Sequence, residues 1–361
     1  MVPSLSPGGN NVFSSRTSPK QILVGTANGV FLLERESGAN EWRIAYRSLP
    51  DHHVHVLLCE PSSGLIFAGI HKGTVYASRD LGESWEPRDR GITEPDIYTL
   101  NALNLNGQVR LFAGTEPARL FLSDNLGVSW REIETLRSVP SAPRWHYPQP
   151  PYIAHVKQIV FHPEDSGTIY VCIEQGALLR SRDGGESWQE LHGFYEDVHR
   201  LAILRSDPRK MYLACGDGLY TSTDAGSSWD RLTSRSCRIG YPDGLVVHPQ
   251  REKLVFISGA GTIPPTWSKH GTANAAIGRS RDGGLTWTFL TNGFPTNFNG
   301  NVEALAMVAS NSSYFLFAGT TEGDVLFSGD EGENWMPIAC ALPPIAKRRH
   351  HLYLKPARAV G

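Results

Sequence analysis

The sequence predicts an all-β fold, a seven-bladed β-propeller, and two observations carry this prediction. An eight-residue motif of the form Ser-x-Asp-x-Gly-x-x-Trp recurs along the chain with small variations. Its tryptophans lie 41 to 58 residues apart, a spacing typical of propeller blades built from several short strands. A degenerate copy ends at Trp42, and six clear copies follow: SRDLGESW (78–85), SDNLGVSW (123–130), SRDGGESW (181–188), STDAGSSW (222–229), SRDGGLTW (280–287) and SGDEGENW (328–335).

The residues of the motif are those that a tight hairpin needs. Alternating apolar residues precede each clear copy, which indicates a strand. Ser and Asp side chains bond to the backbone of a turn, and Gly adopts positive φ without steric cost. The Trp begins the next strand and is expected to pack its ring over the turn. The motif therefore predicts a hairpin between the two outer strands of each blade.

The two ends of the chain are expected to meet in one blade. The first repeat has three strands but no inner strand before them, whereas residues 350–356 (HHLYLKP) match an inner strand with nothing after it. We therefore expect the C-terminal strand to complete the first blade and close the ring, which removes an open sheet edge. Residues 1–20 are expected to form a flexible leader, and residues 21–361 a single propeller.

Composition excludes several classes of protein. The chain has 34 Lys and Arg against 36 Asp and Glu, so a basic face for nucleic acid is not expected. We also expect no membrane partner, because no apolar run is long enough to span a bilayer. The first twenty residues lack the pattern of a secretory signal. Five cysteines without CxxC spacing favour free thiols, and hence a cytoplasmic location.

The repeated motif resembles the bacterial neuraminidase repeat, or Asp-box, of the sialidase-like and WD40/YVTN-like propellers. This group includes sialidases, xyloglucanase-type glycoside hydrolases, sortilin-like receptors and photosystem assembly propellers. The resemblance covers essentially the whole chain after the leader and implies the propeller fold. It implies little about function, because the motif is a structural hairpin remote from the active sites of these proteins.

The chemistry of these relatives does not transfer to this chain residue by residue. Sialidases carry an Arg-Ile-Pro motif, which is missing here, and they have six blades, so sialidase activity is rejected. Xyloglucanase-type enzymes pair two propellers around a cleft, whereas this length suits one propeller. A photosystem assembly factor would be expected to carry a leader peptide and an arginine-rich face, and neither is evident in the sequence.

Titratable residues occupy one face of the expected inner strands, where propeller sites are found. An aliphatic position aligns these strands: Leu57, Leu100, Ile159, Leu201, Leu245, Leu305 and Leu352. Two residues earlier, on the same strand face, the residues are His55, Tyr98, Lys157, His199, Asp243, Glu303 and His350. Two residues earlier again they are His53, Asp96, His155, Asp197, Tyr241, Asn301 and Arg348. The two tiers are expected to ring the mouth of the central channel.

The histidines of this ring predict a metal site. His55, His199 and His350, with Glu303 or Asp243, suit a divalent transition metal ion, which is the expected cofactor. Such an ion would polarise a substrate or lower the pKa of bound water. Tyr98 and Lys157 are then candidates for acid–base or anion-stabilising roles. A wet channel would also be lined by polar groups without any catalytic role, and this alternative stays open.

Loops expected on the same face supply further candidates. Glu116 and Glu174 are candidate ligands or bases. The two longest repeats hold the tryptophans outside the motif, in proline-rich inserts that resemble a pocket wall. Exposed aromatic rings would stack on a sugar or an aromatic compound, or else pack together as a rigid cap. The expected substrate pocket is lined by His53, His71, His155, Trp145 and Trp267.

Three functions remain open on this sequence. The leading one is a metal-dependent enzyme of hydrolase or lyase type that acts on a small molecule at the channel mouth. The second is a non-catalytic propeller that docks a protein or a glycan on the same face. The third is a glycoside hydrolase that uses two carboxylates, such as Glu116 and Glu174, separated by roughly 5 to 10 Å.

Overall fold

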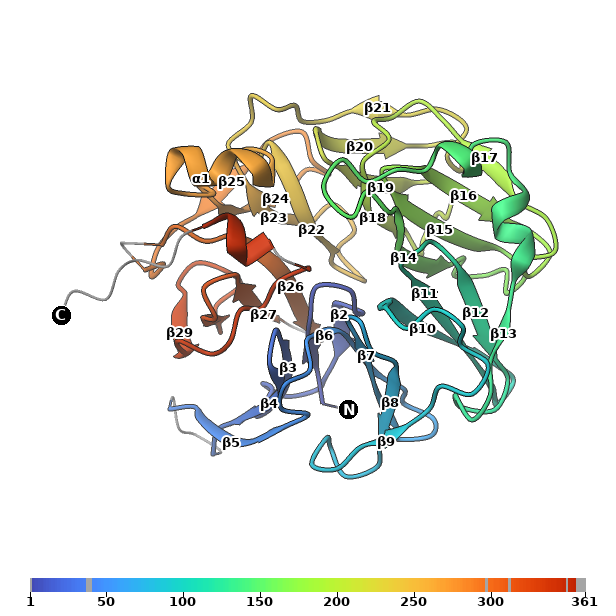
Figure 1. Ribbon diagram of the computed structural model, residues 1–361. Coiled ribbons are helices and arrows are strands. Elements are labelled where there is room, and N and C mark those ends of the chain that lie inside the picture. Colours follow the sequence, from blue (N-terminus) through green and yellow to red (C-terminus); the bar gives the residue numbers. More distant parts are fainter. Residues whose placement is uncertain (1, 37–40, 296–297, 311–312, 349, 355–361) are drawn as a thin grey trace.

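The computed structural model is a ring of seven β-sheets and describes residues 2–36, 41–295, 298–310, 313–348 and 350–354 (Figure 1). The first three blades are β1 (Ser4–Leu5), β3 (Gln21–Thr26), β4 (Gly29–Glu34) and β5 (Arg43–Ser48); β6 (Val54–Cys59), β7 (Ile66–Ile70), β8 (Val75–Ser78) and β9 (Glu86–Pro87); and β10 (Ile97–Leu105), β11 (Gln108–Thr115), β12 (Leu120–Ser123) and β13 (Arg131–Glu132). The seven-bladed propeller predicted from the repeats is confirmed.

The other four blades continue the same order from the inner to the outer strand. Blades four and five are β14 (His155–Phe161), β15 (Ile169–Glu174), β16 (Ala177–Ser181) and β17 (Gln189–Leu191); and β18 (Val198–Ile203), β19 (Met211–Cys215), β20 (Gly218–Ser222) and β21 (Asp230–Arg231). Blades six and seven are β22 (Tyr241–Val247), β23 (Val255–Ala260), β24 (Ala276–Ser280) and β25 (Thr288–Leu290); and β2 (Val12–Ser14), β26 (Val302–Ala309), β27 (Tyr314–Thr320), β28 (Val325–Ser328) and β29 (Met336–Ala339).

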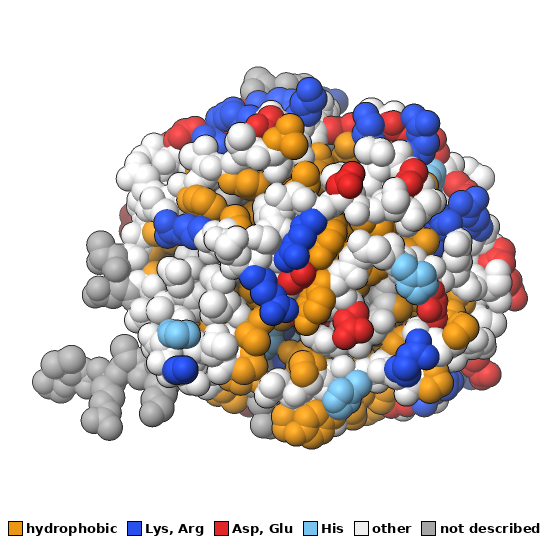
Figure 2. All heavy atoms as spheres, turned by 90° about the horizontal axis from the view of Figure 1, so that it is seen from above, with side chains coloured by type: hydrophobic (Ala, Val, Ile, Leu, Met, Phe, Trp, Pro, Cys, Tyr) orange, Lys and Arg blue, Asp and Glu red, His pale blue; other side chains and the backbone are white. Residues whose placement is uncertain are grey.

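Helices are few and lie in the long connections. They are the 3-10 turns η1 (Glu134–Ser138), η2 (Ala142–Arg144), η3 (Pro264–Thr266) and η4 (His350–Tyr353), and the α-helix α1 (Trp267–His270). Among the described residues, no helix is long and apolar enough to cross a membrane. Figure 2 shows one face of the molecule, on which basic and acidic side chains are interspersed.

The repeated motif forms the expected hairpin. In the copy at residues 181–188, the Ser181 hydroxyl donates to Asp183 at 2.7 Å and accepts the backbone N–H of Gly185 at 2.8 Å. Gly185 has a φ of +102°, a backbone conformation that would be strained for a residue with a side chain. The tryptophan ring closes the turn in several copies, as where the Trp229 indole N–H donates to the carbonyl of Gly226 at 3.1 Å. The turn of the degenerate copy, at 37–40, lies outside the described residues.

The aligned aliphatic position is buried in the inner strand of six blades, which confirms that register. The seventh assignment is wrong: Leu352 lies in η4, is 62% exposed and belongs to no strand. The expected inner strand over 350–356 is therefore not formed at 350–353, and 355–356 lie outside the described residues. β1 takes its place, pairing in parallel with β3 (Ser4 with Leu23, Leu5 with Val24).

The first residues are built into the propeller, so the expectation of a flexible leader is wrong for residues 4–14. β1 completes the first blade, and β2 pairs in parallel with β26 of the seventh. Between these strands the chain crosses the channel, where the Gly8 N–H donates to the carbonyl of His55 at 3.0 Å. The Arg200 guanidinium donates to the carbonyls of Pro7 and Gly9. The N-terminal segment thus joins the first and last blades and plugs the channel.

The C-terminal segment packs across the beginnings of the inner strands. After β29 the chain returns over the ring, where Leu342 N–H donates to the Gly323 carbonyl and Ile345 N–H to the Thr320 carbonyl, each at 3.0 Å. Arg348 N–H then donates to Nε2 of His55 at 3.1 Å. We call residues 342–354 the mouth segment. It places Lys347, Arg348 and His350 against the inner strands.

Candidate functional site at the channel mouth

The titratable residues of the inner strands form a buried network rather than a ring open to water. The tier expected to face the channel is at most 5% exposed in every blade that supplies it: His55, Tyr98, Lys157, His199, Asp243 and Glu303. Buried charges are stable only when they are paired or bonded. Their partners come from the second strand of a blade, from loops and from the mouth segment.

Three ion pairs hold this network together. Lys157 pairs with Glu174 of β15, Lys347 with Asp243 of β22, and Arg348 with Glu116, which follows β11. Burial lowers the pKa of Lys157 to about 8, against the pull of Glu174. Burial acts against the charge of Asp243, but Lys347 brings the pKa of that carboxyl down to about 2. Lys347 is not among the residues predicted from the sequence, because it precedes a segment whose pattern resembles an inner strand but which forms η4.

His155 lies between the two carboxylates proposed for glycoside hydrolysis. Its Nδ1 is 3.3 Å from Oε2 of Glu116, and its Nε2 is 2.6 Å from Oε2 of Glu174. The imidazole therefore fills the space in which a glycosidic bond would have to lie. Tyr98 stacks on the same ring with centroids 3.6 Å apart, and burial raises the pKa of its hydroxyl well above the usual value. The phenol consequently stays protonated at neutral pH.

The three histidines expected to share one metal ion lie in separate groups. His55 stacks on His71 at 4.9 Å and packs edge-on to His53 at 4.7 Å. His199 donates from Nδ1 to the carbonyl of Pro242 at 2.7 Å. His350 Nδ1 lies 2.8 Å from Oε1 of Glu303. The expected centre is thus not assembled, because the segment carrying His350 is a mouth segment and not an inner strand.

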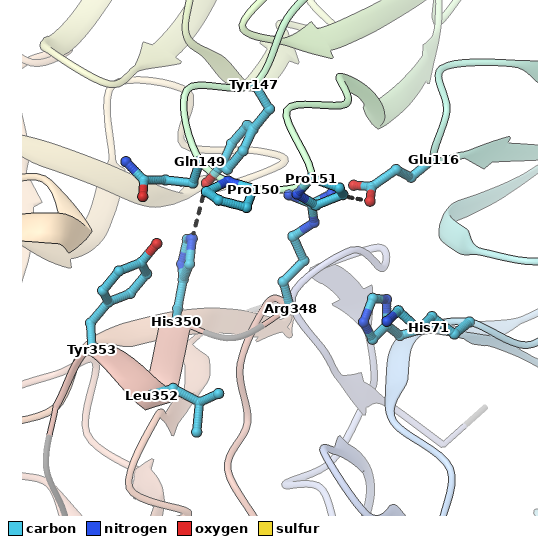
Figure 3. Close-up of a pocket in the computed structure, with 11 residues that line it drawn as sticks. His71, Glu116, Tyr147, Gln149, Pro150, Pro151, Arg348, His350, Leu352 and Tyr353 are labelled. Atoms are coloured by element: carbon cyan, nitrogen blue, oxygen red, sulfur yellow. Dashed lines mark hydrogen bonds and ion pairs between the residues drawn. The ribbon is translucent and has the colours of Figure 1, made fainter.

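A pocket of about 470 Å³, which we call the mouth pocket, opens above this network (Figure 3). The insert after η2 forms one wall, the mouth segment another, and two loops of neighbouring blades the third. Arg348 lies 4.9 Å over the ring of Tyr147 and points toward Glu116. The residues lining the pocket are His71, Lys72, Glu116, Tyr147, Gln149, Pro150, Pro151, Arg348, His350, Leu352 and Tyr353.

The backbone at Arg348 is unusual and is held by its neighbours. Its φ is +40°, in the left-handed region that residues other than glycine rarely adopt. Two hydrogen bonds fix this conformation: Lys347 N–H donates to Glu303 Oε2 at 2.7 Å, and Arg348 N–H donates to His55. A strained residue of this kind persists only where several surrounding contacts hold its backbone in place. Such residues are common in ligand-binding sites. His55 and Glu303 therefore position the guanidinium.

The two tryptophans of the long inserts do not line this pocket. Trp267 is fully buried and packs edge-on to His350 at 5.9 Å and to Tyr353 at 6.4 Å. The expectation that it stacks on a ligand is thus wrong, because its ring is buried against residues of η4. Trp145 donates to Ser141 at 2.8 Å and lines a separate groove of about 430 Å³ with Tyr152.

Comparison with known proteins supports the fold, but the similar proteins fall into two groups with different functions. No family model matches the chain. The xyloglucanase Xgh74A of Acetivibrio thermocellus is 27% identical over 259 residues, which is 62% of this chain and 30% of that protein. The photosystem II assembly lipoprotein Ycf48 of a Synechococcus strain is 20% identical over 337 residues, 90% of this chain and 88% of its own.

Solved structures give the same two groups. Ycf48 from Cyanidioschyzon merolae has a TM-score of 0.60 at 15% identity and covers 90% of this chain and 94% of its own. Ycf48 bound to D1 peptide has a TM-score of 0.57 at 16% identity, with 90% and 92% coverage. An ancestral GH74 enzyme has a TM-score of 0.56 at 16% identity, with 80% and 38% coverage.

The fold is that of the propellers of Ycf48 and of GH74 enzymes. The chain spans about a third of the length of the GH74 proteins that it matches, and nearly all of Ycf48. At these identities the structural likeness concerns the fold alone. The function must therefore be argued from the site itself.

Proposed function

We propose that this chain is a non-catalytic binding propeller that captures a carboxylate-bearing segment of a polypeptide in the mouth pocket. The observation that carries the proposal is the charge of the pocket. Its one carboxylate, Glu116, is already paired with Arg348. Lys72 is then the lining cation without a carboxylate partner among the described residues, since His71 and His350 lie against Asp96 and Glu303. The net positive charge favours an anion, and the Arg348 guanidinium has further N–H donors beyond those facing Glu116 that could bind a ligand carboxylate.

The apolar part of the pocket suits a peptide. Tyr147, Pro150, Pro151, Leu352 and Tyr353 line it beside the basic groups. A volume of about 470 Å³ lies within the usual range of ligand sites and would hold a few residues of an extended chain. The nearly full-length likeness to Ycf48, one structure of which holds a D1 peptide, supports a peptide ligand.

The enzymatic hypotheses have weaker support from the site. The carboxylates named for glycoside hydrolysis are engaged by Arg348, His155 and Lys157. The aromatic platform expected for a sugar is not at the pocket, since Trp267 is buried and Trp145 lies in another groove. The similarity to xyloglucanases covers the propeller fold and identifies no glycan-binding residue in this pocket.

Peptide libraries test the proposed carboxylate requirement. Random hexapeptides without Asp or Glu are made with a free C-terminal carboxylate, with a carboxamide, or with a carboxamide and one internal Glu. We expect the purified chain to bind one or both carboxylate libraries about ten-fold more tightly than the neutral one, because a charge-assisted hydrogen bond is worth about 1.5 kcal/mol or more. Equal binding of all three libraries, or of none, would contradict the proposal.

A further inference from the structure

Three acceptor atoms converge between the fourth and fifth blades, below the mouth pocket. Glu174 ends β15, His199 lies in β18, and Asp197 precedes β18 and forms an isolated antiparallel bridge with Glu174. Nε2 of His199 is 3.3 Å from Oδ1 of Asp197 and 3.7 Å from Oε1 of Glu174. All three side chains are at most 5% exposed.

The hydrogen bonding of these residues leaves the three atoms without a donor. Nδ1 of His199 donates to the carbonyl of Pro242, so Nε2 is the ring nitrogen that is left for another partner. His155 and Lys157 both bond to Oε2 of Glu174, which leaves Oε1. Nε2 of His199, Oδ1 of Asp197 and Oε1 of Glu174 are each buried with no hydrogen-bond partner among the described residues. Such groups are costly unless something binds them.

The geometry of the three atoms suits a metal ion. Ligands 2.0–2.2 Å from a tetrahedral ion lie roughly 3.3–3.6 Å apart, close to the two distances above. One ligand atom from each of the three residues lies within 4.8 Å of the other two. A histidine that donates its second ring N–H to a backbone carbonyl is the usual arrangement of a metal ligand, because the carbonyl fixes the tautomer.

The charge of the network favours a cation here. Six carboxylates are buried at the mouth: Asp96, Glu116, Glu174, Asp197, Asp243 and Glu303. Only three of them have a Lys or Arg partner among the described residues. The ion-pair contacts of Asp96, Asp197 and Glu303 are with histidines.

We propose that Glu174, Asp197 and His199 bind one divalent transition metal ion of the zinc class. The ion joins the inner strands of two blades and supplies the positive charge that Asp197 lacks. His199 was expected from the sequence to bind a metal, but with His55 and His350, and the structure assigns it different partners. This site is separate from the residues that line the mouth pocket, so it does not depend on the proposed function.

Cobalt provides a spectroscopic test. Untagged full-length chain, stripped with a chelator, is titrated with Co²⁺ and then with Zn²⁺. We expect about one equivalent of Co²⁺ with visible d–d absorption, no sulfur-to-cobalt charge-transfer band, and displacement by Zn²⁺. Without such uptake, or with a charge-transfer band that shows cysteine ligation, the proposal is overturned.

Matched variants locate the ion. His199→Gln and Asp197→Asn should each weaken Co²⁺ binding at least ten-fold. His71→Gln should leave it unchanged, because His71 belongs to the other histidine–carboxylate group, with His55 and Asp96. Far-ultraviolet circular dichroism confirms that each variant is folded. If one ligand variant does not fold, the other together with His71→Gln decides. Binding that survives both ligand changes, or is lost in His71→Gln, refutes the assignment.

Discussion

Replacing Lys347 by methionine is expected to lower the free energy of unfolding by about 3–5 kcal/mol, because it leaves the buried carboxylate of Asp243 without its cation. Asp243 is 1% exposed and Lys347 is 3% exposed. Asn301 donates to the other oxygen of Asp243 at 2.7 Å, which is not enough to balance the charge. Chemical denaturation followed by tryptophan fluorescence measures the change.

A double variant separates the charge from the shape of the side chain. In Lys347→Met/Asp243→Asn, the amide oxygen still accepts from Asn301 and no unpaired charge remains. We expect this variant to be more stable than Lys347→Met alone by about 2 kcal/mol, since neutralising both members of a buried pair costs less than removing one. Additive destabilisation by the two changes would show that the pair is not the source of the effect.

Replacing Gly8 by alanine is the second change with a large expected effect. A Cβ on Gly8 would lie 2.3 Å from the carbonyl oxygen of Tyr98 and 3.2 Å from that of His55. Both oxygens are backbone atoms of the inner strands β6 and β10. The N-terminal segment that carries Gly8 must therefore move, rather than the strands. We expect a loss of about 3 kcal/mol, at the upper end of what overpacking usually costs. The melting temperature should fall by several degrees.

Gly64→Asn provides the control for this substitution. Gly64 has a φ of +72°, a conformation that asparagine tolerates, and a Cβ there would meet nothing within 4 Å. Its melting temperature should stay close to that of the unaltered chain. Equal stability of Gly8→Ala and the unaltered chain would mean that the N-terminal segment does not pack in the channel as described.

Local patterns predicted the parts of the fold that are local. The hairpin motif and the aliphatic position of the inner strands repeat in six of the seven blades, and each depends on residues a few positions apart. β1 has only two residues and lies between prolines, so no alternation could reveal it. It pairs with β3 of the first blade, and the hydrophobic pattern of the sequence does not specify this pairing. The C-terminal residues were consequently given its place.

The candidate site was predicted as a set of residues but not as an arrangement. The inner-strand column identified His55, Lys157, Asp243 and Glu303 because strand periodicity places them on one face. Which charge pairs with which depends on the path of the mouth segment across the ring. Lys347 approaches Asp243 from 104 positions along the chain, a contact that no sequence spacing indicates.

Charge at the rim of the mouth pocket tests the binding function most directly. Leu352 is 62% exposed and lines the pocket, so substitutions there should not disturb the fold. The measurement is the affinity of a fluorescent peptide selected from the carboxylate libraries for Leu352→Glu and Leu352→Lys, at low and at high salt. Leu285→Glu and Leu285→Lys are matched controls, because Leu285 is 74% exposed and is not among the pocket residues.

We expect Leu352→Glu to weaken binding about five-fold and Leu352→Lys not to weaken it, a difference of about 1 kcal/mol that shrinks as salt is added. The two Leu285 variants should bind as the unaltered chain does. If Leu352→Glu and Leu352→Lys bind the peptide equally well, the anion does not bind at the mouth pocket, and the proposed function is contradicted.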